Sequence, residues 1–302
     1  MVKHLLNPKD FIKNYSSNNQ AELLFWVVDE HPSRTLRGWL RAMWRLLLGK
    51  GDKSDTNDQE AEQAWRTMES RWGNTNSDTV IQYLVQKFDG IDHLRKFEYA
   101  FLARCLCNPN ICKNVIVDVG GGNSYSTVVP ILLRIPDAQI LSVDVVNHPN
   151  QSKYGVQYVQ GDCMNTNLAD ESVDFVAFIS TLEHVGLGRW GDPLDVDGDI
   201  KAMQEVWRIL KPGGHVVLTI PYGYPTVVFN LNRIYDAGRV LVLTKGFEVL
   251  LAEYSVNGQS CTREDVEGKK TTKFVPGYYR NVPKFRRHPD AQGGALFLLR
   301  RN

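Results

Sequence analysis

The chain has 302 residues, of which 43% are hydrophobic and 23% are charged, and its net charge is +1. This composition is typical of a soluble globular protein, and the small net charge excludes a whole-chain field that would recruit nucleic acid or an acidic membrane. No apolar stretch reaches the roughly 18 residues of a membrane-spanning helix, and the N-terminus lacks the apolar core of a secretory signal. We therefore expect a cytoplasmic protein.

Residues 1–95 are expected to form a helical region that caps the domain after it. Residues 33–48 place apolar side chains on one helical face and arginines on the other. Such a helix fits either a lid packed on the catalytic domain, which we favour, or a peripheral contact with a membrane surface. Residues 49–62 are polar and poor in apolar side chains, which is typical of a flexible loop.

From residue 96 to residue 302 the pattern changes to alternating strands and helices. Alternation of this kind predicts an α/β fold, with a doubly wound, Rossmann-like, mostly parallel seven-stranded sheet. The last two strands are separated by about 40 polar residues with no usable helix, so we expect them to form an antiparallel pair at the sheet edge, with an antiparallel last strand. The strands are expected at residues 114–119, 139–143, 156–159, 173–180, 214–220, 247–255 and 294–301, and the helices at 126–134 and 199–210.

Residues 115–126, Val-Ile-Val-Asp-Val-Gly-Gly-Gly-Asn-Ser-Tyr-Ser, are the most informative segment. A β-branched run that ends in an acidic residue and three glycines indicates a buried parallel strand followed by a tight turn into a helix. Glycine tolerates positive φ and lets a ligand approach the main chain, and the helix N-terminus offers free N–H groups. The turn therefore predicts a nucleotide-like ligand and a cofactor-dependent enzyme.

Polar residues also follow the next three strands. Asp144 ends the second strand, where a carboxylate can accept both hydroxyls of an adenosine ribose. Asp162 follows the third strand, where it can accept a hydrogen bond from an adenine amine. The fourth strand ends in residues 180–184, Ser-Thr-Leu-Glu-His. In doubly wound sheets, ligands bind at this carboxyl edge.

Taken together, these motifs resemble those of class I S-adenosylmethionine-dependent methyltransferases, in particular the type-11-like domain. The resemblance covers about residues 96–302, and an antiparallel final strand separates that family from dinucleotide dehydrogenases. The motifs that carry it are Asp118-x-Gly120-x-Gly122, Asp144, Gly161-Asp162, the acidic residues of 170–174, Leu182-Glu-His184 and residues 205–214.

The resemblance implies S-adenosylmethionine as the cofactor. Asp118 would meet the methionine amine or a bridging water, Asp144 the ribose, and Asp162 with the Cys163 amide the adenine. Ser124 stands where the family has the third glycine of Gly-x-Gly-x-Gly, which is a departure from the pattern. The full set of expected cofactor-binding residues is Asp118, Gly120, Gly121, Gly122, Asn123, Ser124, Asp144, Val145, Asp162, Cys163, Ser180, Thr181 and Leu182.

Two groups of residues are candidates for catalysis and for binding the acceptor. His184 could take a proton from a hydroxyl acceptor, or it could only shape the pocket, and Glu183 could orient the loop. Arg189, Trp190 and Tyr222 are the expected acceptor contacts. Residues 188–199 are similar to a motif of poorly characterised methyltransferase-like proteins, several of them associated with glycan biosynthesis, which implies a carbohydrate or related small molecule as acceptor.

No metal site is expected. The carboxylates of residues 192–199 are spaced as in calcium or magnesium loops, but the distal glutamate is missing and Asp199 is equally well explained as a helix N-cap. The five cysteines lack the partners of a zinc site, so we expect reduced thiols. Residues 254–293 interleave basic and aromatic side chains, but acidic residues dilute the charge, so we expect an acceptor loop and no nucleic acid.

We therefore expect a methyltransferase that acts on an oxygen or nitrogen of a small molecule, such as a sugar, a glycan or a secondary metabolite. A nicotinamide-dependent oxidoreductase would need a glycine near Tyr125. A cofactor-binding scaffold without activity is not excluded by the sequence. An amino-methylating nucleic-acid enzyme would carry an Asn-Pro-Pro-Tyr-like signature where Ser180-Thr-Leu-Glu183 stands. The sequence leaves the oligomeric state open.

Overall fold

The computed structural model describes most of the chain after residue 92. The described residues are 22–25, 93–121, 135, 137–145, 156–188, 191–229, 232–256, 259–268, 271–274, 287–290 and 293–302. The amphipathic helix predicted at 33–48, the loop predicted at 49–62 and the helix predicted at 126–134 lie outside these residues.

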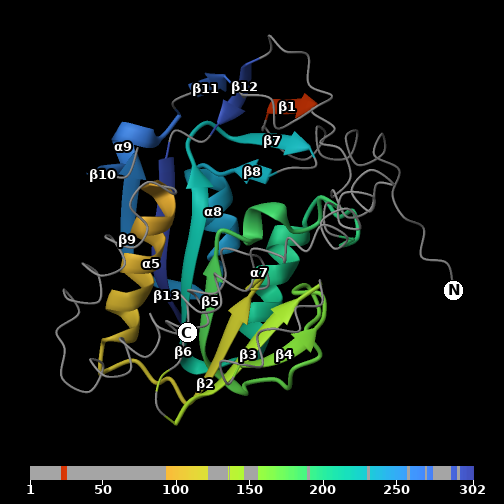
Figure 1. Ribbon diagram of the computed structural model, residues 1–302, viewed down its shortest axis with the longest axis vertical. Helices are drawn as coiled ribbons and strands as arrows, with labels where there is room; N and C mark the ends of the chain where they lie inside the picture. The colour runs from red at the N-terminus through yellow and green to blue at the C-terminus, as the bar shows by residue number, and fades with distance from the viewer. Residues whose placement is uncertain are drawn as a thin grey trace, which may run out of the picture.

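An eight-stranded sheet forms the centre of the molecule, in the order β10-β9-β13-β6-β5-β2-β3-β4 (Figure 1). Strands β4, β3, β2, β5 and β6 are parallel, and β13 is antiparallel to both of its neighbours. The strands are β2 (Val115–Val119), β3 (Gln139–Asp144), β4 (Val156–Gln160), β5 (Val173–Ile179), β6 (Leu210–Tyr222), β9 (Phe247–Val256), β10 (Gln259–Cys261) and β13 (Gly293–Arg301). The predicted doubly wound sheet with an antiparallel last strand is confirmed.

The last two predicted strands, β9 and β13, form an antiparallel pair at one end of the sheet, as the sequence predicts. β13 lies between β6 and β9 and not at the edge, and the short strand β10 adds an eighth strand beyond β9. Burial explains this order, because residues 294–299 are buried throughout, whereas β9 exposes side chains such as Glu248 and Leu251. A strand buried on both faces belongs inside a sheet, and one with an exposed face tolerates the edge.

Two hydrophobic cores lie on opposite faces of the sheet, because successive strand residues point to opposite sides. On β5, Phe175, Ala177 and Ile179 share one core with helix α5 (His93–Leu106). The alternate residues Val176 and Phe178 share the other core with helix α7 (Gly198–Ile209). The alternation in the sequence therefore places α5 and α7 on the two faces, as predicted for a doubly wound fold.

The junction between α7 and β6 follows from its breaker residues. The helix ends at Ile209, and residues 211–214, Lys-Pro-Gly-Gly, bulge between the pairings Val173–Leu210 and Phe175–His215. Gly213 has a φ of 77°, which a residue with a side chain rarely adopts. At the other end, the N-cap of α7 is Asp197 and not Asp199, which lies inside the first turn.

A second, three-stranded sheet lies beyond the carboxyl ends of the parallel strands (Figure 1). It contains β1 (Glu22–Phe25), β7 (Thr226–Phe229) and β8 (Asn232–Ile234), with β1 parallel to β7. β1 is thus a strand within the region expected to be helical. Its four residues pair with β7, which lies about 200 residues later in the chain, so no local pattern predicts this strand. Among the described residues, no helix combines the length and apolar character needed to cross a membrane.

The segment between β9 and β13 also contains more structure than the predicted polar loop. It holds β10, the short helix α9 (Arg263–Val266) and the antiparallel pair β11 (Thr271–Phe274) and β12 (Arg287–Asp290). Helix α8 (Ala237–Leu243) precedes β9 and is capped by the Asp236 side chain, which accepts from the Arg239 amide. β10, α9, β11 and β12 lie with β7 and β8 near one end of the sheet, toward the carboxyl ends of the parallel strands, whereas α8 lies beside the sheet (Figure 1).

Candidate cofactor-binding site

The glycine turn after β2 is packed too closely for side chains. A Cβ atom on Gly120 would lie 2.2 Å from the Thr181 Cγ2 atom, and one on Gly121 would lie 1.8 Å from an Asp118 carboxylate oxygen. Gly120 also has a φ of 73°, and its amide donates to the Val143 carbonyl at 2.8 Å. The ends of β2, β3 and β5 therefore meet here, as the sequence predicts. Gly122, Asn123 and Ser124 lie outside the described residues.

Asp118 is a buried carboxyl group, with 1% of its surface exposed, at the start of this turn. Its Oδ2 atom has no hydrogen-bond partner among the described residues, and neither has the hydroxyl of Ser142 on the neighbouring strand β3. Burial, and to a lesser extent the charge of Asp144, raise the pKa of Asp118 to about 8. A buried acceptor without a donor is rare in proteins, and it fits a ligand that brings a donor.

The other two acidic residues expected to bind the cofactor also follow strands at this edge. Asp144 ends β3, where its main-chain carbonyl accepts from the Tyr158 hydroxyl at 2.9 Å, and Val145 follows it half-buried. Asp162 follows β4, and its Oδ1 atom accepts from the Met164 amide at 2.9 Å, which closes a tight turn. Cys163 within this turn is buried, and burial raises the pKa of its thiol.

The segment after β5 carries the other expected site residues. Ser180 has a φ of 41°, and Leu182 begins the 3-10 helix η2 (Leu182–His184) with its side chain in the core. Glu183 is 4% exposed, and its Oε1 atom lies 3.7 Å from Nε2 of His184, whose side chain is 25% exposed. A partly accessible imidazole thus stands beside a buried carboxylate, which suits a proton acceptor.

Of the three residues expected to contact the acceptor, the structure describes only Tyr222. Arg189 and Trp190 lie outside the described residues. Tyr222 ends β6 but is 1% exposed, with its ring 5.2 Å from that of Tyr254 and its hydroxyl donating to Glu267 at 3.3 Å. Burial raises the pKa of Tyr222 to about 12. The Tyr222 ring is thus packed in the core, and its contact with an acceptor stays a prediction.

The carboxylates of the loop before α7 bond to the protein itself. Asp192 accepts from the amides of Gly186 and Gly188 at 2.9 Å and 3.1 Å, and Asp195 pairs with Lys201. The two carboxylate oxygens of Asp199 accept from Nε and Nη2 of Arg239. In the described part of the chain, no group of three or more His, Cys, Asp or Glu side chains could hold a metal ion.

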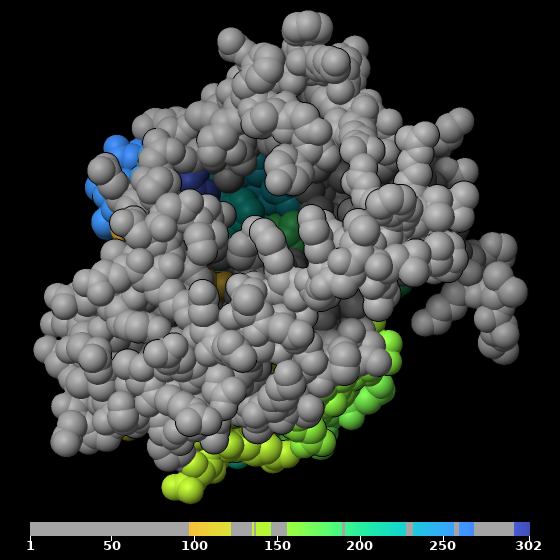
Figure 2. Space-filling model, in the orientation of Figure 1, coloured from red at the N-terminus to blue at the C-terminus, as the bar shows by residue number. Residues whose placement is uncertain are grey.

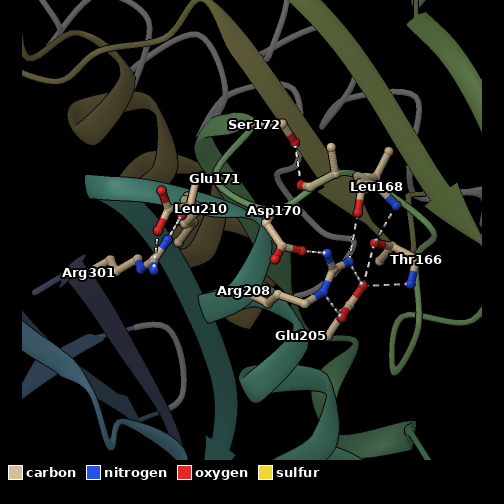
Figure 3. A network of polar contacts seen from close by, with 10 residues as sticks. Thr166, Leu168, Asp170, Glu171, Ser172, Glu205, Arg208, Leu210 and Arg301 are labelled. Atoms are coloured by element: carbon tan, nitrogen blue, oxygen red, sulfur yellow. Dashed lines mark hydrogen bonds and ion pairs between the residues drawn. The ribbon is translucent and has the colours of Figure 1, made fainter.

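A polar network fixes the loop that carries Asp162 (Figure 3). Glu205 on α7 accepts from the amide and hydroxyl of Thr166 at 2.8 Å and 2.6 Å, and from Nε of Arg208 at 2.8 Å. Arg208 also donates to the Leu168 carbonyl at 2.8 Å and pairs with Asp170. The Glu205-Val-Trp-Arg208 motif, read from the sequence as part of the family pattern, therefore binds the loop between β4 and β5 to α7.

Replacing Arg208 with lysine is expected to lower the free energy of unfolding by about 1 kcal/mol, because an ammonium group cannot make the two parallel bonds to Glu205. The Arg208 side chain is 33% exposed, which limits the loss. Urea unfolding would measure it. Arg300→Lys is the matched control, because Arg300 pairs with Glu248 where both side chains are nearly half exposed. Equal losses in the two variants would contradict the role given to Arg208.

Two buried charged residues near the site were not predicted from the sequence as site residues. Glu98 on α5 is 1% exposed and accepts from hydroxyls near the ends of β5 and β6. Arg233 on β8 is also 1% exposed and donates to the Val185 carbonyl, directly after His184. A glutamate between two aromatic residues, Phe97-Glu-Tyr99, could have indicated the first, whereas no sequence pattern indicates the second.

Figure 2 shows a hollow in the middle of one face, with gold, green and teal atoms at its floor. By the colour bar, gold belongs to the part of the chain that contains α5, green to the part that contains β4 and β5, and teal to the part that contains β6 to β8. A sheet edge that ends in a hollow is where a doubly wound fold binds its ligand.

The fold and this edge together define a class of proteins. The parallel sheet, the antiparallel strand between β6 and β9 and the glycine turn before a buried carboxyl group are the arrangement that the resemblance to class I S-adenosylmethionine-dependent methyltransferases implies. The chain is similar to the demethylmenaquinone methyltransferase of Staphylococcus epidermidis, with 28% identity over 149 residues, which are 46% of this chain and 57% of that enzyme. The match thus spans little more than half of its curated relative.

The chain is also similar to a protein-family model and to solved structures. Residues 133–276 match DUF268, which is described as a Caenorhabditis protein of unknown function. A putative methyltransferase of Bacillus halodurans has a TM-score of 0.44 and 15% identity, covering 67% of this chain and 97% of that chain. The 1,6-didemethyltoxoflavin-N1-methyltransferase of Burkholderia thailandensis, solved with 1,6-didemethyltoxoflavin and S-adenosylhomocysteine, has a TM-score of 0.44 and 14% identity, covering 75% and 86%.

Proposed function

We propose that the chain is a methyltransferase that moves the methyl group of S-adenosylmethionine to an oxygen or nitrogen of a small molecule. The observation that carries this proposal is the buried Asp118 carboxyl group, whose Oδ2 atom has no described donor, beside a turn in which Gly121 has no room for a side chain. A ligand amine would supply the donor that this oxygen lacks. The similarity to a curated methyltransferase supports the same class.

The residues at this edge fit the cofactor. Asp118 would accept from the amine of its amino-acid part, and Asp144 would accept from the ribose hydroxyls. Asp162 and the Cys163 amide would hold the adenine, while the main chain from Ser180 to Leu182 would line the amino-acid part. When bound, S-adenosylmethionine supplies a methyl group that is already activated by a sulfonium. The protein then has to orient the acceptor and exclude water.

His184 is the residue that we propose as the proton acceptor. Its imidazole is partly accessible at the end of η2, and Glu183 lies 3.7 Å away with its side chain almost fully buried. A buried carboxylate beside an imidazole can fix the orientation of the ring and stabilise it once it has gained a proton. A hydroxyl acceptor would transfer its proton to His184 as the new bond to carbon forms.

The acceptor is proposed to be a sugar, a glycan or a secondary metabolite. Support for this comes from the sequence of residues 188–199, with Arg189 and Trp190, and not from a described contact. The helical region expected before residue 95 would act as a lid over the site. We also propose that the protein is cytoplasmic and that it has no nucleic-acid partner. Both proposals are based on its composition and net charge.

Calorimetric titration with S-adenosylhomocysteine tests the proposal. We expect the native protein to bind it with micromolar affinity and Asp144→Ala to bind it at least about tenfold more weakly, because two hydrogen bonds to a charged acceptor are lost. Glu248→Ala, which changes an exposed residue of β9 away from β2, β3 and β4, is the matched control and should bind as the native protein does. A native protein that binds no S-adenosylhomocysteine, but does bind a nicotinamide dinucleotide, would favour an oxidoreductase.

A further inference from the structure

Glu98 is a buried carboxylate that the sequence patterns of the cofactor site do not include. It lies on α5 and is 1% exposed. Its Oε1 atom accepts from the Thr219 hydroxyl at 2.8 Å and from the Ser180 hydroxyl. A carboxylate is costly to bury and is kept inside a protein only where hydrogen bonds compensate for the lost water. Here the two donors come from adjacent strands of the sheet, β5 and β6.

The same residues form a closed ring of hydrogen bonds around Ser180. The Ser180 amide donates to the Thr219 hydroxyl oxygen at 3.0 Å and to the Thr219 carbonyl at 3.2 Å. The Thr219 hydroxyl in turn donates to Glu98, which also receives the Ser180 hydroxyl. Both the main chain and the side chain of Ser180 are therefore fixed, directly or through Thr219, by one carboxylate.

Ser180 needs such support because of its backbone conformation. Its φ of 41° is positive, which is uncommon for a residue with a side chain and costs about 1–3 kcal/mol. Residues held in this way occur mostly at functional sites, where surrounding contacts determine their conformation. The next residue, Thr181, lies so close to Gly120 that a Cβ atom on Gly120 would clash with the Thr181 methyl group. The conformation of Ser180 therefore sets how the end of β5 meets the glycine turn.

We propose that Glu98 is a positioning residue, which acts through Ser180 and Thr219 to hold the end of β5 in the conformation that binds the amino-acid part of the cofactor. This inference rests on the proposed function. The ring of hydrogen bonds includes neither Asp144 nor Asp162, which would bind the ribose and the adenine from β3 and β4. Loss of Glu98 therefore weakens the binding of the amino-acid part and spares the nucleoside part.

Two ligands separate these parts. S-adenosylhomocysteine carries both, whereas 5′-methylthioadenosine carries the nucleoside and lacks the amino-acid part. We expect Glu98→Ala to bind S-adenosylhomocysteine at least about tenfold more weakly, a change that corresponds to about 1.4 kcal/mol. The same variant should bind 5′-methylthioadenosine within about twofold of the native protein. Glu98→Gln keeps an oxygen that can accept from both hydroxyls, and it should restore most of the affinity for S-adenosylhomocysteine.

Controls separate this role from a purely structural one. Glu253→Ala removes the carboxylate that pairs with Arg104, also on α5, and should leave both affinities unchanged. Thr219→Val keeps the shape of the side chain and removes the hydroxyl, so it replaces Glu98→Ala if that variant does not fold. It should weaken the binding of S-adenosylhomocysteine and leave the binding of 5′-methylthioadenosine unchanged. Equal losses for both ligands, or no loss in either variant, would overturn the role of Glu98 while the proposed function stands. A native protein that binds neither ligand overturns the proposed function and this inference with it.

Discussion

Replacing Asp118 with asparagine is expected to stabilise the cofactor-free protein at pH 8 and above, although it removes a residue of the site. Burial is the main reason that the pKa of Asp118 rises from 3.8 to about 8. The unfolded chain therefore loses this proton near pH 4, whereas the folded protein loses it near pH 8. A group whose pKa is higher in the folded state contributes stability that is fully present below the lower value and is lost as pH rises through the higher one.

Asparagine resembles the protonated carboxyl group in shape and stays neutral at all pH values. The native protein and Asp118→Asn should thus be similarly stable near pH 4, and the variant should be more stable at pH 9, by an amount on the order of a few kcal/mol. Chemical denaturation between pH 4 and pH 9 would measure the difference. A constant difference across this range would contradict the assignment, because it would show that folding does not raise the pKa of Asp118.

The same substitution should weaken the binding of S-adenosylhomocysteine by at least about tenfold, because a charge-assisted hydrogen bond to the ligand amine is lost. Below pH 8, binding to the native protein should release the proton of Asp118, since a cationic amine favours the ionised carboxylate. Calorimetry in buffers of different ionisation enthalpy would detect this proton, and Asp118→Asn should release none. Asp118→Asn should therefore be more stable than the native protein but bind the ligand less well. Both effects arise because the Asp118 carboxylate is buried without a donor until the ligand binds.

Of the proposed substitutions, Asp199→Ala is expected to lower the free energy of unfolding most, by about 3–5 kcal/mol. Asp199 is fully buried between two arginines, and its Oδ2 atom lies 3.1 Å from Nε of Arg239 and 3.8 Å from Nε of Arg233. Removing the carboxylate takes away the negative charge that lies 3.8 Å from the Arg233 guanidinium, which is 1% exposed. Urea unfolding of the two proteins would measure the loss.

Asp197→Ala is the matched control for this experiment. Asp197 is 44% exposed and lies 3.6 Å from the same Arg239, so its loss should cost less than about 1 kcal/mol. Arg233 also donates to the Val185 carbonyl, so Asp199→Ala should loosen the segment after His184 as well. Losses of similar size in the two variants would show that burial of the Asp199–Arg233 pair does not matter for stability.

Much of the fold could be predicted from the sequence because its signals are local. The β-branched runs, the breakers Lys211-Pro-Gly-Gly214 and the glycine turn each determine the conformation of their own segment, and the structure has the strands, the end of α7 and the turn where these patterns predict them. The meeting of Gly120 with Thr181 also follows, because parallel strands end at one edge. The roles of the residues at that edge stay predictions.

Local sequence patterns predict the elements, their faces and the carboxyl edge where a cofactor would bind, since periodicity shows which side of an element is buried. Which distant groups meet at that edge depends on the packing of the whole domain. Glu98 contacts Ser180, 82 residues away, and Thr219, 121 residues away, and Asp199 pairs with arginines of β8 and α8. The same packing places β13 inside the sheet. The physical reason is that the partner of a buried charge depends on how whole elements pack, which no local pattern records.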